Sequence, residues 1–458
     1  MESAYPDHEI FIHTKMMSLY APPVGMHRIW QGAKTAMRLW SQQSNMDKAA
    51  HILKTSLGQL RGPLLKAGQL TAMIPGLLPS SVSDALQDLC AHAPPMGWSF
   101  VRRRMMHEMG PMWKDRFSWF SPEPSFAASL GQVHKACFWN ETYETAHLVA
   151  CKLQYPGLDR VIETDLAQLR FFCRIYEHKM KALDTTYLQE ELKIRLYEEL
   201  NYLQECEHMK WFHAMFQTYP NLKKSICIPS PLFCTERLII MSWVEGKSIQ
   251  EAIDLPQSLR NELGTLLFKA WYAPFYSHGA LHGDPHMGNA TWTYEGGVLQ
   301  LNLLDFGCVR LFPPQFVEGV LKLYRALQTQ NLEQAHAAYE QWGFHALSHA
   351  QLEALNAWAT LLFAPFLLDR GPCLLEEVSS VDRGKMAALH VQSLLKQHGL
   401  VKPPKAFLLM DRVAVVLGAV LMRLKVRANW FDLFQEVSAS FSLFSCEKAQ
   451  NTLCSDRN

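Results

Sequence analysis

Residues 282–289 read HGDPHMGN, and residues 303–307 read LLDFG. Asn289 follows Asp284 by five positions, and Asp305 follows Asn289 by sixteen. Asp305 supplies a carboxylate and Asn289 an amide oxygen, and Mg²⁺ takes hard oxygen ligands of this kind. Asp284 is a carboxylate that can orient or deprotonate a hydroxyl group. The two stretches together predict a magnesium site with a general base beside it.

The same order of residues is typical of the catalytic centre of the kinase fold. That fold has an Asp, an Asn five residues later, a hairpin and then Asp-Phe-Gly. In kinases Mg²⁺ neutralises the charge that develops as the phosphoryl group leaves ATP. A zinc site is the poorer interpretation, because His282 and His286 would need a helix to share a face and Pro285 opposes one.

A kinase fold also needs a strand lysine that holds the α- and β-phosphates. Residues 149–152, VACK, stand where this element belongs, so Lys152 is the candidate. A helix glutamate should pair with it, and Glu205 is our choice within 198–205, EELNYLQE. Several carboxylates crowd that stretch, so spacing alone does not select one, and a solvated charged face is the alternative.

Two features of ordinary protein kinases are missing. The loop before the first strand, 125–132, reads SFAASLGQ and has one glycine, so it is stiffer than a Gly-rich loop. Its backbone N–H groups can still bind phosphate. No Ala-Pro-Glu follows Asp305, so the usual activation segment and peptide platform are absent from the sequence.

Two pairs of short strands interrupt an otherwise helical pattern. Residues 133–138 and 147–153 are rich in β-formers around a polar turn, and 290–294 and 298–304 flank a Gly-Gly turn. We therefore predict an α+β fold, in which a small antiparallel-sheet lobe precedes a helical lobe with helical extensions at both ends.

The predicted domains follow from these patterns. Residues 1–120 form a mostly helical N-terminal extension, and 121–246 form the sheet lobe with inserted helices. Residues 247–458 form the helical lobe, which carries the catalytic stretch and a C-terminal helical extension.

Composition bounds the partners and the compartment. Lys and Arg total 44 and Asp and Glu 43, and this balance argues against a nucleic-acid partner. A hydrophobic share of 48% excludes global disorder. The most apolar run, 413–422, is too short to span a membrane and predicts a buried helix. The 11 cysteines show no C-x-x-C spacing and no secretory signal opens the chain, so we predict reduced thiols.

These residues resemble the UbiB/ADCK (aarF-domain) family of atypical kinases, which supports ubiquinone (coenzyme Q) biosynthesis. The family's motif Lys-x-Gly-Gln, in an N-terminal helical extension, is present as KAGQ at 66–69. Its Ala-rich loop is similar to 127–134, AASLGQVH, and its lysine strand continues into QYPG at 154–157. The resemblance runs over about 57–311 and implies a two-lobed, atypical protein-kinase-like fold.

The resemblance also implies roles for individual residues. It places the Lys-x-Gly-Gln helix over the peptide site, where it blocks ordinary protein-kinase activity, and it assigns Glu205 as the partner of Lys152. The residues assigned to catalysis are Asp284, Lys152 and Glu205. Those assigned to the nucleotide are Ala127, Ala128, Ser129, Lys152, Met241, Lys66 and Gln69, and those assigned to metal are Asn289, Asp305 and Glu199.

Two positions depart from the family pattern. Asn201 stands where the family's Glu-x-Asp motif, here 199–201, has its Asp, and Phe126 stands where the Ala-rich triplet has its first alanine. Both put nucleotide preference and turnover in question, but neither removes a residue of the catalytic set.

Three hypotheses follow. The first is an ATP- and Mg²⁺-dependent UbiB-type atypical kinase or ATPase in ubiquinone or related isoprenoid lipid metabolism. The second is a small-molecule phosphotransferase of the aminoglycoside or choline kinase type, in which a glycine also follows the catalytic-loop histidine; the KAGQ motif discriminates against it. The third is a nucleotide-gated scaffold without catalysis.

The first hypothesis carries expectations about partners and place. The partners are a nucleotide and a quinone or isoprenoid lipid, or the enzymes that make it. The protein is expected in the cytoplasm, or on the matrix side of the mitochondrion in a eukaryote, with peripheral membrane contact. The low charged fraction, 19%, fits a lipid-facing surface.

Overall fold

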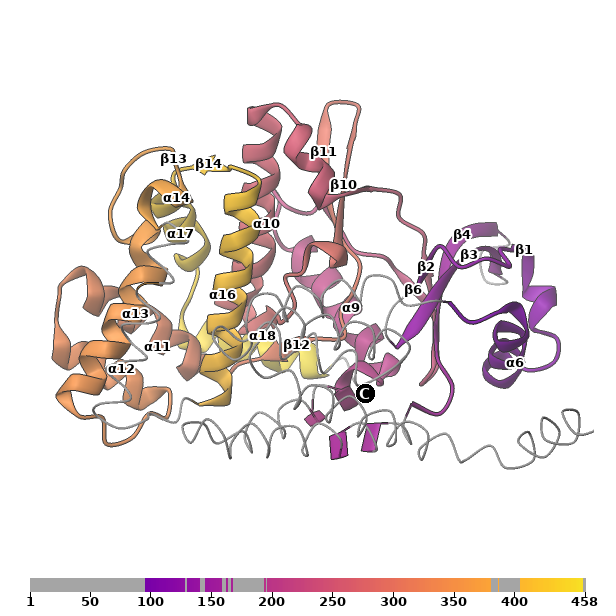
Figure 1. The fold of residues 1–458 in the computed structure, drawn as a ribbon, viewed down its shortest axis with the longest axis horizontal. Helices are drawn as coiled ribbons and strands as arrows, with labels where there is room; N and C mark the ends of the chain where they lie inside the picture. The colour runs from indigo at the N-terminus through magenta and orange to yellow at the C-terminus, as the bar shows by residue number, and fades with distance from the viewer. Residues whose placement is uncertain are drawn as a thin grey trace, which may run out of the picture. The chain divides into compact units, whose positions relative to one another are not determined.

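The computed structural model describes most of the chain beyond residue 94. The described residues are 95–127, 130–140, 145–158, 162–163, 166–167, 193–194, 196–379, 386 and 404–455. They form two compact units, and Figure 1 shows their elements. The first unit takes in the described residues up to Trp139 and from Cys151 to Leu200. The second takes in Asn140–Ala150 and the described residues from Asn201 onward. The predicted domain boundaries at 120 and 246 stay a prediction.

The first unit combines one long helix with antiparallel strands. Its elements are α6 (Trp98–Met109), η1 (Trp113–Arg116), β1 (Phe117–Phe120), β2 (Phe126–Ala127), β3 (Gly131–Asn140) and the last part of β4 (Thr145–Gln154). Both β1 and β2 pair antiparallel with β3, with Phe120 opposite Ala136 and Ala127 opposite Gln132.

Helix α6 is fixed to the end of β4 by one buried arginine. The Arg104 guanidinium donates from Nε to the Gln154 carbonyl at 3.1 Å and from Nη2 to the Tyr155 carbonyl at 3.3 Å. It also forms an ion pair with Glu108 one turn later on α6. Its charge is therefore compensated inside the unit, as a buried charge requires.

The second unit holds the rest of the strands. The first part of β4 lies beside β7 (Leu238–Ser242), where Trp243 N donates to the Leu148 carbonyl, and β7 pairs antiparallel with β6 (Pro231–Cys234). A four-stranded sheet has the order β5-β11-β10-β8. Its strands are β5 (Ile226–Cys227), β8 (Lys247–Ser248), β10 (Ala290–Glu295) and β11 (Val298–Leu303). A short pair joins β9 (Ala280–His282) to β12 (Val309–Leu311).

Helices make up most of the second unit. The buried helix α10 (Gln257–His278) packs against β9, β11, α17 and α18, and Figure 1 shows it beside the β10–β11 hairpin. The other helices are η2 (Ile249–Asp254), η3 (Met287–Asn289), α9 (Tyr202–Gln217), α11 (Pro314–Gln328), α12 (Leu332–Gln341), α13 (His349–Leu367), α14 (Leu375–Val378), α16 (Lys405–Arg423), α17 (Trp430–Ser438) and α18 (Leu443–Ser455). Rings from α10, α11, α13 and α17 form one aromatic core around Phe434.

The predicted class, helices with an antiparallel sheet, is confirmed, and so are both predicted hairpins. The run at 413–422 lies inside α16, and no helix in the described part of the chain is both long and apolar enough to cross a membrane.

Two short strands lie in regions where the sequence pattern is mostly helical. Phe117–Phe120 is a strand, because its backbone completes the edge of β3, and β13 (Cys373–Leu374) pairs with β14 (Arg427–Ala428) inside the C-terminal region. Both pairings join segments that are distant in sequence, and local periodicity does not register such pairings.

The prediction that all thiols are reduced is wrong for one pair. Cys206 on α9 and Cys234 on β6 form a disulfide across 28 positions, with their Cα atoms 6.8 Å apart. The packing of α9 on β6 brings the two together. No local spacing in the sequence marks them as partners.

Candidate active site

The candidate site is built around His282 at the end of β9. Its Nε2 donates to the Asp305 carbonyl, and its Nδ1 accepts from the Asp284 backbone N–H at 3.2 Å. A carbonyl oxygen only accepts, so Nε2 carries the proton and Nδ1 is free to accept. Burial lowers the pKa of His282, partly offset by its bond to the Asp305 carbonyl, and the bond that Nδ1 accepts requires the neutral ring. One imidazole thus ties the HGDPHMGN loop to the LLDFG segment.

Within the loop, Asn289 bonds to the carboxylate that precedes it by five positions. Asn289 Nδ2 donates to Asp284 Oδ2 at 2.9 Å and to the Asp284 carbonyl at 3.3 Å. The backbone joins the two stretches a second time, because Leu304 N donates to the Asn289 carbonyl at 2.9 Å. Since the amide nitrogen of Asn289 is committed to Asp284, its Oδ1 is the atom left for a cation.

Asp305 begins a tight turn, and helix α9 contacts the next residue, Phe306, through both its ring and its carbonyl. Gly307 N donates to Asp305 Oδ1 at 2.9 Å. The Phe306 ring is fully buried and packs against Phe212 of α9 and against His282. His208, also on α9, donates from Nδ1 to the Phe306 carbonyl at 3.0 Å. Helix α9 therefore fixes the conformation of the segment that presents Asp305.

The donor set fits magnesium better than zinc. Asn289 Oδ1 and the Asp305 carboxylate are hard oxygen ligands, and Mg²⁺ is usually held by one or two protein groups with water and phosphate oxygens completing the shell. Among the described residues, no group of three or more His, Cys, Asp or Glu side chains is arranged to hold a metal ion.

Arg412 of α16 is a site residue that the sequence reasoning missed. Its Nη2 lies 3.3 Å from Asp284 Oδ1, and the two side chains are only 12% and 9% exposed. Its buried Nε has no hydrogen-bond partner among the described residues. The neighbouring Asp411 accepts from Trp358 Nε1 at 2.6 Å, and burial raises its pKa to about 6. The only signal in the sequence is that two adjacent charged residues, Asp411 and Arg412, precede the most apolar run of the chain.

Lys152 and Glu205 differ in burial and in the unit to which they belong. Lys152 lies on β4 in the first unit and is half-buried, between the fully buried Cys151 and Leu153. Glu205 lies in the first turn of α9 in the second unit and is 2% exposed. The predicted pairing of Glu205 with Lys152 stays a prediction.

Asn201 has a structural role that its departure from the family motif did not suggest. It is the N-cap of α9, and its Oδ1 accepts from Gln204 N at 3.1 Å. Asn is among the best N-cap residues, and Asp serves equally well. Glu199 precedes it, half-buried in the first unit. Its assignment to metal stays a prediction.

The other predicted nucleotide residues are spread over the chain. Met241 is buried near the end of β7, and Ala127 ends β2 in the first unit. Phe126 is 63% exposed. Ala128, Ser129, Lys66 and Gln69 lie outside the described residues.

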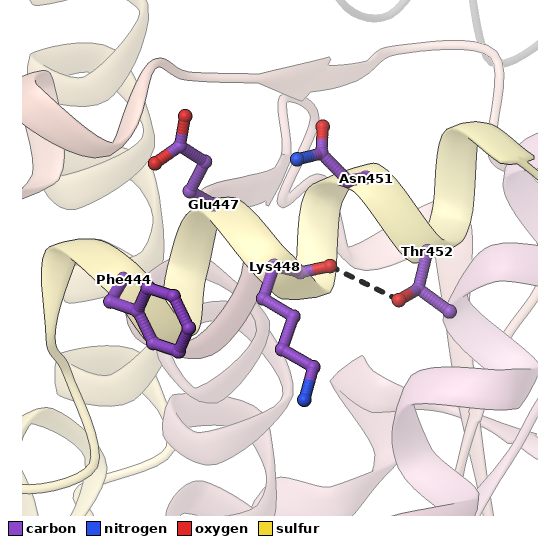
Figure 2. A pocket seen from close by; sticks show the side chains of 5 residues that line it. All are labelled: Phe444, Glu447, Lys448, Asn451 and Thr452. Carbon is purple, nitrogen blue, oxygen red and sulfur yellow. Dashed lines mark hydrogen bonds between the residues drawn. The ribbon is translucent and has the colours of Figure 1, made fainter.

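A separate hollow of about 530 Å³ lies on α18, lined by Phe444, Glu447, Lys448, Asn451 and Thr452. Figure 2 shows that all five side chains come from this one helix, with the Thr452 hydroxyl donating to the Lys448 carbonyl at 3.0 Å. It contains none of the predicted site residues and no group of the catalytic loop.

Comparison with known proteins finds similarity to atypical kinases. A family model described as the ABC1 atypical kinase-like domain matches residues 88–339. The chain is 28% identical over 297 residues to an uncharacterized chloroplastic aarF domain-containing protein kinase of Arabidopsis thaliana, covering 64% of this chain and 40% of that protein. It is 26% identical over 325 residues to the mitochondrial atypical kinase COQ8 of Saccharomyces cerevisiae, covering 70% of this chain and 62% of that protein. The match thus spans about two-fifths to three-fifths of the length of these relatives.

A solved structure is similar over most of the chain. Rv3197 of Mycobacterium tuberculosis, in its complex with erythromycin, superposes with a TM-score of 0.56 at 25% identity, covering 86% of this chain and 96% of that one. The predicted atypical kinase-like fold is confirmed by this likeness and by the family model.

Proposed function

The chain belongs to the ABC1 atypical kinase-like family, and we propose that it is a Mg²⁺-dependent, ATP-binding kinase or ATPase of the UbiB type. The observation that carries the proposal is that hydrogen bonds connect Asp284 and Asn289 to each other and connect their loop to the segment of Asp305. Asp284 and Asn289 share a hydrogen bond, and the His282 ring ties their loop to the backbone of Asp305.

Each residue has a role in this proposal. Asn289 and Asp305 would hold a Mg²⁺ ion, which would neutralise charge on the nucleotide phosphates. Asp284 orients the attacking hydroxyl or water and accepts its proton. Lys152 holds the phosphates and Glu205 orients that lysine, as the family resemblance implies. Arg412 fixes Asp284 through its ion pair.

The decisive measurement is ATP hydrolysis by the purified chain with and without Asp305→Asn. We expect this substitution to lower the rate about a hundredfold or more, because it removes the charge that holds the cation. Asp254→Asn, at an exposed position in η2, is the matched control and should leave the rate unchanged. An Asp305→Asn variant that binds and turns over Mg-ATP normally would remove the metal assignment.

We further propose that the output serves ubiquinone or related isoprenoid lipid metabolism, with a quinone-type lipid or its biosynthetic enzymes as partners. Support comes from family membership and from the kinship with COQ8. The test is quinone profiling of a deletion strain complemented by wild type or by Asp305→Asn. Wild type should restore quinone and the variant should not; unchanged quinone in the deletion strain would end the pathway assignment and leave the ATPase proposal standing.

A scaffold without turnover has one observation in its favour. Both carboxylate oxygens of Asp284 are engaged, one by Asn289 and one by Arg412, so this base is restrained before any substrate arrives. If an Asp284→Asn variant restores quinone as fully as wild type does, nucleotide binding without catalysis is the function.

The small-molecule phosphotransferase alternative has lost part of its basis. Gly283 is a feature shared with that class, but here a Cβ at this position would lie 2.5 Å from the Cys308 carbonyl oxygen. Backbone packing therefore requires the glycine whatever the substrate. Phosphate transfer to a sugar, choline, an aminoglycoside or erythromycin in a screen of the wild-type protein would restore this alternative.

A further inference from the structure

The Cys206–Cys234 disulfide joins helix α9 to one end of a tight hairpin. Cys234 is the last residue of β6, which pairs antiparallel with β7. In the turn that follows, Thr235 Oγ1 accepts from the backbone N–H groups of Arg237 and Leu238 at 3.2 and 3.1 Å. The turn is thereby held by its own side chain. The disulfide therefore attaches the N-terminal part of α9 to a well-fixed part of the sheet.

The same helix supports the segment that presents Asp305. His208 and Phe212 are four positions apart on α9 and so share one face of the helix. The Phe212 ring lies 5.3 Å from the Phe306 ring, between centroids, and His208 Nδ1 donates to the Phe306 carbonyl at 3.0 Å. At a rise of about 1.5 Å per residue, Cys206 lies within about 9 Å of both residues along the helix axis. Because so short a piece of helix moves as one body, freedom at Cys206 is transmitted to Phe306.

The disulfide is accessible from one side. Cys206 is only 4% exposed, whereas Cys234 is partly exposed, so an incoming thiolate reaches the Cys234 sulfur. The S–S bond then breaks, a mixed disulfide forms at Cys234, and the Cys206 sulfur leaves with the electron pair and takes up a proton. The second thiol of a dithiol reductant displaces the Cys234 sulfur in turn. Two electrons and two protons thus pass to the protein, and the dithiol becomes a disulfide.

Several free thiols in the described part of the chain are poorly suited to such exchange. Burial raises the pKa of the thiols of Cys151, Cys227, Cys373 and Cys446, the last of them to about 11. The thiolate is the reactive form of cysteine, and a raised pKa keeps these side chains protonated at neutral pH. Thiol–disulfide exchange is therefore directed to the Cys206–Cys234 pair rather than to these four thiols.

We propose that Cys206–Cys234 is a reversible redox site that controls the affinity for Mg²⁺-nucleotide. The oxidised bond holds α9, and through it the Asp305 segment, in the position that binds the cation, and reduction by a dithiol releases α9 and weakens binding. This inference rests on the proposed function. In the reduced protein the supporting position of α9 is one of several, so binding has to select it and the affinity falls. Bound Mg²⁺-nucleotide in turn favours the oxidised form, because coupling between two sites is reciprocal.

The test measures nucleotide binding to oxidised wild type and to wild type reduced by dithiothreitol. The probe is Mg-AMP-PNP, an ATP analogue that is not hydrolysed, and we expect its affinity to fall about tenfold on reduction. In EDTA the loss should stay within about twofold, because Asp305 acts on the nucleotide only through the cation. By reciprocity, saturating Mg-AMP-PNP should make the midpoint potential of the disulfide about 30 mV more negative, which is the same tenfold factor for a two-electron couple.

A second measurement needs no nucleotide. Gly307 N donates to Asp305 Oδ1, so exchange of this amide hydrogen with solvent reports on the Asp305 turn. We expect exchange at Gly307 to become faster on reduction, while the amides of α13 keep their rates.

Variants separate the redox site from general stability. Cys234→Ala lacks the bond under all conditions and should bind Mg-AMP-PNP as reduced wild type does, with Cys206→Ala as a second variant in case the first does not fold. Cys373→Ala keeps the bond and should respond to dithiothreitol as wild type does. Leu352→Ala opens a cavity beside α13 and lowers stability without touching the bond, so it should keep the affinity of oxidised wild type.

Three results would overturn the inference and leave the proposed function standing. The first is an unchanged Mg-AMP-PNP affinity in reduced, folded wild type. The second is an equal loss with Mg²⁺ and in EDTA, which would make the bond merely structural. The third is the finding, by alkylation and mass spectrometry, of free thiols at Cys206 and Cys234 in the oxidised protein. An oxidised wild type that binds no Mg-AMP-PNP would instead overturn the proposed function and the inference with it.

Discussion

Asp284 is held by two parts of the chain that lie far apart in sequence. Its Oδ2 accepts from Asn289, five residues away, and its Oδ1 pairs with Arg412, 128 residues away. Sequence spacing predicts the first contact because both residues belong to one short loop. It does not predict the second, because a helix can bring any of its residues to the loop and only the tertiary packing decides which.

Removing Arg412 should affect the chemical step more than nucleotide binding. In Arg412→Ala the buried Asp284 carboxylate loses this ion pair, so its position and charge state are held less tightly. We expect kcat for ATP hydrolysis to fall on the order of tenfold to a hundredfold with KM nearly unchanged, and Arg412→Lys to recover part of the rate. Arg423→Ala, exposed on the same helix, should behave as wild type. Equal effects of the two alanine substitutions would exclude a specific role for Arg412.

At the scale of elements, the hairpins were predictable and the covalent link was not. Both hairpins are local: alternating β-formers flank a polar or Gly-Gly turn, and each strand pairs with its neighbour in sequence. By contrast, the Cys206–Cys234 disulfide depends on where α9 packs on β6. The Asn201 cap also became visible only once the start of α9 was known.

The disulfide should contribute measurably to stability. Closing a loop across 28 positions removes chain entropy from the unfolded state, worth on the order of 3–4 kcal/mol in the loop-entropy account. Urea unfolding with a reductant should therefore show a lower free energy of unfolding than without one. The Cys206→Ala/Cys234→Ala variant should have the lower free energy of unfolding both with and without reductant. In Cys373→Ala the reductant should lower the free energy of unfolding as much as it does in wild type. If reductant does not change the unfolding of wild type, the bond makes no such contribution.

At the scale of the whole molecule, the family motifs predicted a two-lobed, kinase-like fold, but motifs do not show which residues pack into each compact unit. Motifs cluster at ligand sites, whereas the units are defined by packing throughout the chain. Residues 140–150, for example, group with the second unit although 131–139 and 151–154 group with the first, so one hairpin is shared. A linear reading of the sequence assigns such a hairpin to a single domain.

Asp411 should make the stability of the fold depend on pH in a defined direction. Its pKa is about 6 in the folded protein against an ordinary value of 3.8, so the folded state holds this proton more tightly than the unfolded state. The contribution is therefore fully present below about pH 3.8 and is lost as the pH rises through about 6. The difference amounts to about 3 kcal/mol.

Asp411→Asn keeps an oxygen for the Trp358 indole but carries no charge at any pH. The variant should gain free energy of unfolding relative to wild type on going from pH 4 to pH 7.5, measured by urea unfolding at both values. Asp432→Asn, on α17, serves as the control acid. A constant difference between Asp411→Asn and wild type across this range would contradict the assignment.

Two histidines hold consecutive carbonyls of the Asp-Phe-Gly segment: His282 the carbonyl of Asp305, and His208 the carbonyl of Phe306. Both rings are almost completely buried, so their bonded N–H protons are shielded from water. Such N–H protons exchange slowly with water, so each ring should give its own imidazole N–H resonance in a proton NMR spectrum. The protein therefore carries two built-in spectroscopic reporters of the segment that presents Asp305, each readable without labelling or altering a residue that touches nucleotide or metal.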